Sequence, residues 1–309
     1  MFEPQSTNLI TQSELFSDPS WIIQGGGTLG LNTYLSPSGE NNASELNLPS
    51  TLSRITYGLG TTGVHTFSIY LRSDTDGTIS IRAASGNPSV EQQVSLTSQW
   101  QRFDISVTDG NFWQVIKTAS DTLTSVYIWG AQLEALSYAS SLIPTSGSQV
   151  TRNQDVCTNG GSLATINSTE GVLYAEIAAL ADDRTFRYIS ISDGTLTSNV
   201  IRFYYGNSTN RFTVRYYVNN TIQCNLNYIL PDETIFNKIA FKWKENDFAL
   251  WVNGVEVATD FSGTVSPTNT FNKIHFNFAG LSNFYGKTKA LAVWKEALSD
   301  SELQSLTTI

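Results

Sequence analysis

The chain has 309 residues, which exceeds the usual size of one domain and predicts two domains of roughly 150 residues each. Charged residues make up 15% of the chain, and the net charge of −9 divides into 12 acidic and 5 basic residues in 1–150 and 15 acidic and 13 basic residues in 151–309. Neither half therefore carries the basic patch that a nucleic acid partner requires.

Membrane, secretion and metal signals are absent from the sequence. No apolar run approaches the roughly 18 residues of a membrane span, and the N-terminus lacks the basic-then-apolar order of a signal peptide. Cys157 and Cys224 are too few for a disulfide framework or a structural zinc site, while a single bridge and two free thiols both stay open. We expect no membrane span and no required cofactor.

The N-terminal half is dominated by alternating apolar and polar residues, the pattern of strands with one face in a core. It first passes through a glycine-rich run at 25–30, which predicts a loop because no Lys-Ser or Lys-Thr pair follows it. Alternation is clear at 67–71 (FSIYL) and 102–107 (RFDISV), with turn signals between them at 73–77 and 85–88.

The second half begins after a polar connector at 143–152 that carries Pro, Ser and Gly, so we place the domain boundary after residue 148. Alternation resumes at 238–244 (KIAFKWK). Residues 249–258 predict a tight hairpin, because Asn253 and Gly254 supply the two positive-φ residues of a type I′ turn. A capping box at 299–302 opens a short C-terminal helix, expected to lie across the sandwich edge.

These elements predict an all-β fold. It consists of two tandem antiparallel β-sandwich or jelly-roll domains, 1–148 and 149–309, followed by the short C-terminal helix.

Several motifs resemble known families. The first half is similar to a carbohydrate-binding-module-like jelly roll of bacteriophage tail-fibre and virion structural proteins, on the segments 3–9 (EPQSTNL), 13–21 (SELFSDPSW), 36–40 (SPSGE), 129–134 (WGAQLE) and 138–147 (YASSLIPTSG). The second half resembles the concanavalin A-like or laminin G-like sandwich that often follows it, on the segments 168–176 (STEGVLYAE), 187–193 (RYISISD) and 293–303 (VWKEALSDSEL).

The resemblance implies a non-catalytic fibre or decoration module on a virion surface. Its expected partners are bacterial surface glycans, other virion proteins and further copies of the chain in a trimer or dimer. It also implies a structural calcium in the first domain, with Glu14 and Glu134 as ligands. Because the first motif usually follows an attachment segment, we expect either a fragment or a short variant with another means of attachment.

Catalysis by a glycoside hydrolase would need two closely placed carboxylates. The nearest pair, Glu256 and Asp260, flanks the far arm of the predicted hairpin at a spacing of four. His65 begins a strand and His275 alternates with core residues, and no third residue stands at the spacing of a catalytic triad. The sequence therefore predicts a protein that is not an enzyme.

Glycan binding is predicted from large side chains that fall out of phase with the core. In three segments the inward set leaves five such residues on the other face, namely Arg202, Tyr204, Arg215, Tyr217 and Trp251. Exposed rings stack on sugar faces, so the five are candidate ligand-binding residues on a shared concave sheet. The alternative is that a loop or another subunit covers them. Tyr70, Arg82 and Trp113 are weaker candidates in the first half.

The favoured interpretation is an adhesion module that binds bacterial surface glycans and acts through avidity. A purely structural virion scaffold is the first alternative. A polysaccharide depolymerase is the second.

Overall fold

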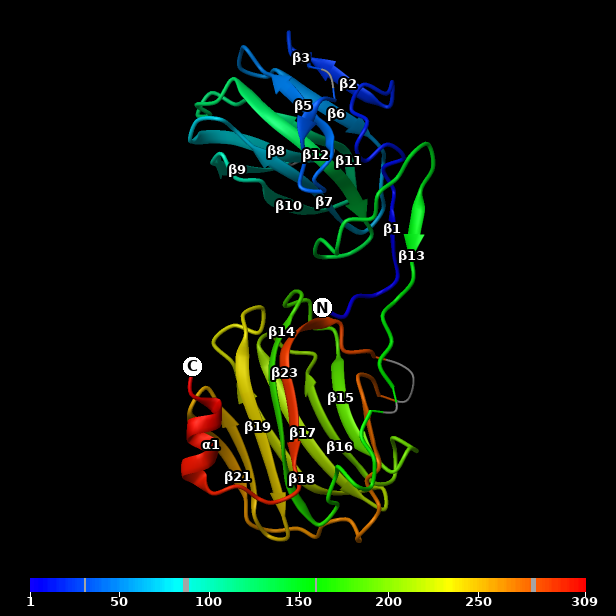
Figure 1. Cartoon of the computed structure of the whole chain (residues 1–309), viewed down its shortest axis with the longest axis vertical. Helices are drawn as coiled ribbons and strands as arrows, with labels where there is room; N and C mark the ends of the chain where they lie inside the picture. Colours follow the sequence, from blue (N-terminus) through cyan, green and yellow to red (C-terminus); the bar gives the residue numbers. More distant parts are fainter. Residues whose placement is uncertain (31, 86–88, 159, 279–281) are drawn as a thin grey trace. The chain divides into compact units, whose positions relative to one another are not determined.

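The computed structural model describes residues 1–30, 32–85, 89–158, 160–278 and 282–309, so the predicted turn at 85–88 lies largely outside the described residues. The chain divides into two compact units. We call Gln5–Asn153 the N-terminal domain, and Gln154–Ile309 together with Met1–Pro4 the C-terminal domain. Each is a two-layered, antiparallel β structure, which confirms the predicted all-β class (Figure 1).

The division falls after Asn153 rather than after residue 148. The reason is that β13 (Val150–Arg152), within the predicted connector, pairs with β1 (Ser6–Asn8). The first four residues belong to the other domain, where Phe2 exchanges two backbone hydrogen bonds of 2.8 and 2.9 Å with Gly286. The Phe2 ring also stacks on Phe276 at 4.5 Å.

The N-terminal domain packs two sheets around one core. One sheet has the order β10-β7-β12-β5-β3, with β4 beside β5, and the other has the order β2-β6-β11-β8-β9. The strands are β2 (Trp21–Gln24), β3 (Thr28–Leu29), β4 (Tyr34–Leu35), β5 (Asn41–Asn47), β6 (Arg54–Gly58), β7 (Val64–Arg72), β8 (Gly77–Ser85), β9 (Val90–Leu96), β10 (Gln101–Thr108), β11 (Gly110–Ile116) and β12 (Ser125–Glu134). Alternate residues such as Phe67, Ile69 and Leu71 fill the core, as the sequence pattern predicts.

The C-terminal domain has the same plan. Its sheets have the orders β21-β20-β19-β14-β23 and β18-β17-β16-β15-β22. The strands are β14 (Glu170–Ala179), β15 (Arg187–Ser192), β16 (Val200–Tyr205), β17 (Arg211–Val218), β18 (Thr221–Ile229), β19 (Asn237–Lys244), β20 (Phe248–Val252), β21 (Val255–Asp260), β22 (Lys273–His275) and β23 (Gly286–Trp294). The predicted inward sets, including Phe203 and Phe212, are fully buried between the sheets.

The hairpin and the helix form where the sequence predicts them. Asn253 and Gly254 join β20 to β21 with φ values of 50° and 85°, as a type I′ turn requires. Helix α1 (Asp300–Thr307) begins with a capping box in which the Glu302 carboxylate accepts a 2.8 Å hydrogen bond from the Ser299 backbone N–H. Among the described residues, no helix is long and apolar enough to cross a membrane.

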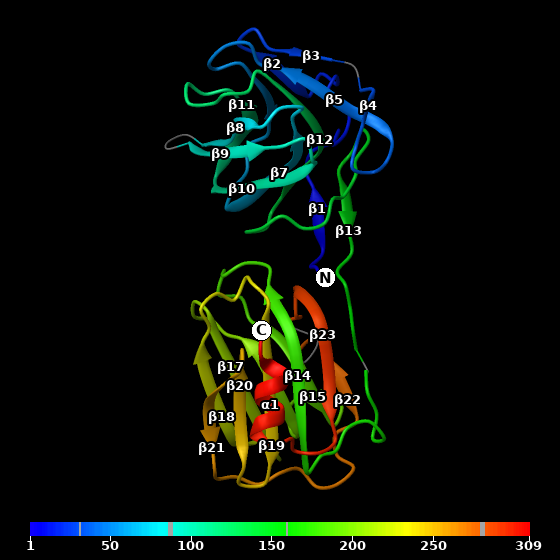
Figure 2. The same ribbon diagram turned by 60° about the vertical axis from the view of Figure 1, so that its left-hand side comes forward.

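Helix α1 covers a sheet face rather than the predicted sandwich edge. It packs against β19, β20 and β21 (Figure 2). Leu303 is fully buried there in a small apolar cluster with Tyr174, Ala240 and Trp251. The outer face of this sheet is therefore a second, minor core.

Two buried charged residues, Arg187 and Glu233, lie in the C-terminal domain. Arg187 begins β15, and Glu233 lies between β18 and β19. The Arg187 guanidinium forms a 2.7 Å ion pair with Asp183 and donates a 3.1 Å hydrogen bond to the Thr185 carbonyl. Glu233 is only 1% exposed, and its Oε2 has no hydrogen-bond partner in the part of the chain that the structure describes. Burial, reinforced by Asp182, raises the pKa of Glu233 to about 7.

Replacing Leu303→Ala is expected to destabilise the C-terminal domain by about 2 to 4 kcal/mol, because it opens a cavity beneath α1. Urea denaturation followed by tryptophan fluorescence measures the change. The exposed neighbour Gln304→Ala serves as the control and should leave the free energy of unfolding unchanged. Equal stability of the two variants would contradict the packing of α1 on the sheet.

Replacing Glu233→Gln is expected to stabilise the protein at pH 8 by about 1 to 3 kcal/mol and to change little below pH 5. The folded state binds this proton more tightly than the unfolded chain does. The wild type therefore loses stability as the pH rises through about 7, whereas the amide does not. Urea titrations from pH 4.5 to 8, with the exposed Glu245→Gln as control, measure the difference. Parallel pH profiles for the wild type and Glu233→Gln would show that the prediction is wrong.

Candidate functional site

The candidate site is the outer face of the sheet β18-β17-β16-β15-β22. The inward-facing residues of these strands pack in the core. The alternate residues, which are polar and aromatic, point outward. We define the arginine-tyrosine face by the residues Tyr188, Arg202, Tyr204, Arg211, Thr213, Arg215, Tyr217, Asn225 and Asn227.

Strand register brings four of the five predicted ligand-binding residues together. Arg202 on β16 lies directly opposite Arg215 on β17, and Tyr204 lies opposite Thr213. Tyr217 is the next outward residue on β17, where its ring faces the Arg202 guanidinium. The four residues therefore share one outward face as predicted, although Tyr204 is only 4% exposed, and their role in ligand binding stays a prediction.

Aromatic rings form a continuous cluster on this face. Tyr188 stacks on Tyr204 at 4.4 Å, and Phe186 lies 5.8 Å from Tyr188 and 6.1 Å from Tyr204. Phe186 is 36% exposed and thus offers a ring to solvent, whereas the two tyrosine rings are mostly covered. Burial raises the pKa of Tyr188 to about 12, with the neighbouring Tyr204 adding to the effect, so its phenol stays neutral and able to donate.

The three arginines of the face have neutral partners. Arg202 lies over the rings of Tyr217 at 4.2 Å and Phe278 at 4.0 Å, and it donates a 3.2 Å hydrogen bond to the Tyr217 hydroxyl. Arg215 donates to the Asn225 side-chain oxygen at 3.1 Å, and Arg211 donates to that of Asn227 at 2.9 Å. Each guanidinium keeps further N–H donors for a ligand, since it has five.

A hollow of about 200 Å³ opens on this face beside the aromatic cluster. It is lined by Phe186, Tyr188, Tyr204, Gly206, Asn207, Arg211, Thr213 and Arg215. One aromatic wall and several hydrogen-bond donors therefore meet in one small concavity, which suits a single sugar ring with polar substituents.

Trp251 does not belong to this site, so the prediction of one shared face is wrong for this residue. It lies on β20 of the opposite sheet and is 6% exposed beneath α1. Alternation correctly places its side chain outward. Alternation does not indicate which of the two sheets a strand joins, nor that a helix returns to cover it.

Sequence reasoning missed Tyr188, Arg211, Phe186 and Phe278. Tyr188 alternates with the core residue Ile189, and Arg211 alternates with Phe212, so the same counting rule would have found both. Phe186 and Phe278 lie just outside the strands, where no periodic signal exists.

The two predicted calcium ligands have separate partners. Glu134 is fully buried, and its carboxylate accepts hydrogen bonds from the Ser6 hydroxyl at 2.6 Å and from the backbone N–H of Ser140 at 3.0 Å, as well as from the Ser140 hydroxyl. Glu14 instead accepts from Asn42 at 3.0 Å. Within the described ranges, no three His, Cys, Asp or Glu side chains form a metal-binding group. These contacts give the calcium site no support, and calcium binding stays an untested prediction.

The nearest candidate pair of catalytic carboxylates is separated by a β-bulge. Glu256 pairs with Trp251, whose side chain faces outward, whereas Asp260 pairs with the core residue Phe248 after a register shift. Directly opposite residues share a sheet face, so the two carboxylates lie on opposite faces. His65 and His275 are both buried, as structural histidines are.

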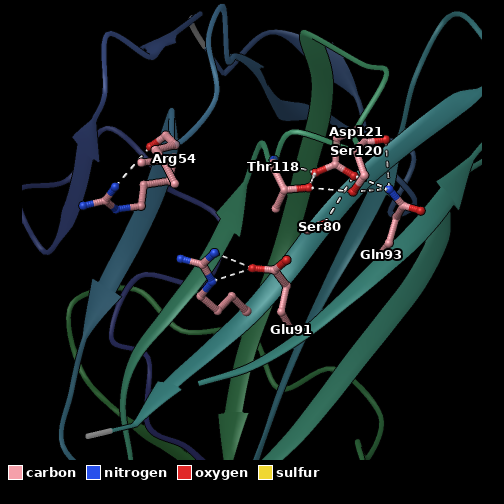
Figure 3. Close-up of polar contacts among 9 residues, drawn as sticks. Arg54, Ser80, Glu91, Gln93, Thr118, Ser120 and Asp121 are labelled. Carbon is pink, nitrogen blue, oxygen red and sulfur yellow. Dashed lines mark hydrogen bonds and ion pairs between the residues drawn. The ribbon is translucent and has the colours of Figure 1, made fainter. Parts of the chain in front are cut away.

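The weaker candidates of the N-terminal domain do not share a surface. Trp113 is fully buried in the core, so its prediction is wrong, because β11 faces the core at that position. Arg82 forms an ion pair with Glu91 on the outside of the sheet β2-β6-β11-β8-β9, and Tyr70 belongs to the other sheet. Figure 3 shows that outside surface, where Asp121, Thr118 and Gln93 bond to one another rather than present free groups.

Comparisons with known proteins give no family for this chain. No protein-family model and no curated protein matches it. It is similar to the CBM40 of Ruminococcus gnavus IT-sialidase bound to alpha2,3 sialyllactose, with 19% identity and a TM-score of 0.39 over 45% of this chain and 83% of that one. The SAP-like pentraxin from Limulus polyphemus aligns with 15% identity and a TM-score of 0.39 over 49% and 74%. Mouse laminin alpha1 domains LG4-5 align with 12% identity and a TM-score of 0.32 over 97% and 93%. At these identities and TM-scores, the likeness assigns no function.

Proposed function

We propose that the protein is a non-catalytic module that binds glycans through the arginine-tyrosine face. The observation that carries the proposal is the position of the partly exposed Phe186 ring at a hollow that is also lined by Arg211, Arg215 and Asn207. Sugar rings present C–H faces to aromatic groups and hydroxyls to polar ones, so this combination matches their chemistry.

We further propose that the glycans belong to a bacterial surface and that the module is displayed on a bacteriophage particle. The motifs of the first half support this, because they resemble virion fibre proteins, and the second half resembles the sandwich that often follows them. The composition supports it too, since a chain with only 15% charged residues is typical of extracellular or particle-bound β proteins. In a homodimer or homotrimer several copies would act together, which converts weak single contacts into firm attachment.

Replacing Phe186→Ala is expected to weaken glycan binding roughly three- to tenfold, because it removes the ring on which the sugar stacks. The measurement is binding of the full chain to an array of purified bacterial capsular, teichoic and O-antigen polysaccharides. The matched control is Phe112→Ala, which removes a 50% exposed ring from the outside of the N-terminal domain.

The control variant should bind as the wild type does. An array that stays blank with the intact multimer would overturn the proposal. So would a loss of binding in Phe112→Ala equal to that in Phe186→Ala, because nonspecific contact with exposed rings would then explain the binding.

A further inference from the structure

The strands that form the arginine-tyrosine face carry basic residues and no acidic ones. The five strands of its sheet contain four arginines and one lysine but no aspartate or glutamate. Arg202, Arg211 and Arg215 point to the open side. The chain as a whole has a net charge of −9, so this local excess does not follow from composition.

On the opposite sheet of the same domain, three lysines are paired with carboxylates. Lys244 forms an ion pair with Glu170 at 3.4 Å, Lys289 pairs with Glu176 at 3.0 Å, and Lys242 pairs with Asp247 at 2.8 Å. Carboxylates are therefore placed next to cations where no ligand is proposed, and are missing from the strands of the proposed site.

Arg202 and Arg215 lie directly opposite each other in the strand register. Like charges at directly opposite positions destabilise a sheet. Their contacts are with the Tyr217 phenol and the Asn225 amide, neither of which neutralises a guanidinium. In addition, the Nε of Arg202 is buried without a hydrogen-bond partner among the described residues.

We infer that the ligand is an anionic glycan, in which a carboxylate or phosphate group is held by Arg211 and Arg215 at the hollow while the sugar ring lies on Phe186. Guanidinium groups bind such oxyanions through paired, charge-assisted hydrogen bonds. An oxyanion bound to Arg215 also neutralises one member of the like-charged pair that Arg215 forms with Arg202. This inference rests on the proposed glycan-binding function.

A nucleic acid offers the same oxyanion but fits the domain less well. The C-terminal domain has 16 acidic and 12 basic residues, whereas a nucleic acid backbone needs a continuous basic path. Arg211 and Arg215 instead lie at one hollow beside an aromatic ring.

The test compares the binding of the full chain to polymers that differ in charge. The probes are alginate, alginate whose carboxylates have been chemically reduced, poly(glycerol phosphate), neutral dextran and a single-stranded oligonucleotide. The wild type should bind alginate or poly(glycerol phosphate) at least about tenfold more tightly than reduced alginate or dextran, and more weakly as salt is added. The alginate and phosphate arms identify the source of the oxyanion.

Arg211→Gln and Arg215→Gln should each weaken binding to the anionic polymer about tenfold. Lys289→Gln, on the opposite sheet, is the matched control and should bind as the wild type does. Because Arg215→Gln removes one member of a like-charged pair, its melting temperature should equal or exceed that of the wild type. A lower melting temperature would show that the arginines stabilise the sheet, and would overturn the inference.

The failures of the two proposals are distinguishable. If neutral polymers bind as tightly as anionic ones, and the arginine variants bind normally while Phe186→Ala does not, glycan binding stands and the anionic preference is overturned. Binding to none of the polysaccharides overturns both. Tighter binding to the oligonucleotide than to every polysaccharide also overturns both, in favour of a nucleic acid ligand.

Discussion

The packing of two sheets against each other is the interaction on which the rest of the C-terminal domain depends. Phe203 and Phe212 meet edge to face at 4.6 Å on neighbouring strands, within a core that takes every second side chain of β16 and β17. The remaining side chains must then face outward, and they are the arginines and tyrosines of the site. A register slip of one residue would bury Arg202 and Arg215 and expose the phenylalanines, so core packing also fixes the site.

The two outward faces of this domain serve different ends. One is closed by α1, whose Leu303 packs in the cluster with Trp251, and Lys242 and Lys289 of this sheet are paired with carboxylates. The other is formed by strands that lack acidic residues and carries arginines whose partners are neutral. Lysines of the covered sheet are therefore paired with carboxylates. Arginines of the sheet where we propose a ligand are bonded to neutral side chains instead.

The buried ion pair of Arg187 connects the core to the aromatic wall of the site. Its guanidinium contacts Asp183 and the Thr185 carbonyl, and both residues lie within three positions before Phe186. Phe186 lies in a loop, where no strand pairing sets its position. The ion pair and hydrogen bond replace that pairing, so a charge that costs free energy to bury helps to position the exposed ring.

The sequence by itself determined the all-β class, the type I′ hairpin at Asn253 and Gly254, the capped C-terminal helix and the outward direction of Arg202, Tyr204, Arg215 and Tyr217. These features depend on local periodicity and turn chemistry, which are written in consecutive residues. Only the tertiary structure decided that Trp251 lies on the other sheet beneath α1, that Met1–Pro4 joins the C-terminal domain, and that a bulge separates Glu256 from Asp260. It also brought the loop residues Phe186 and Phe278 to the site. Such features depend on which distant strands pair and what covers them, and alternation along a single strand carries no information about either.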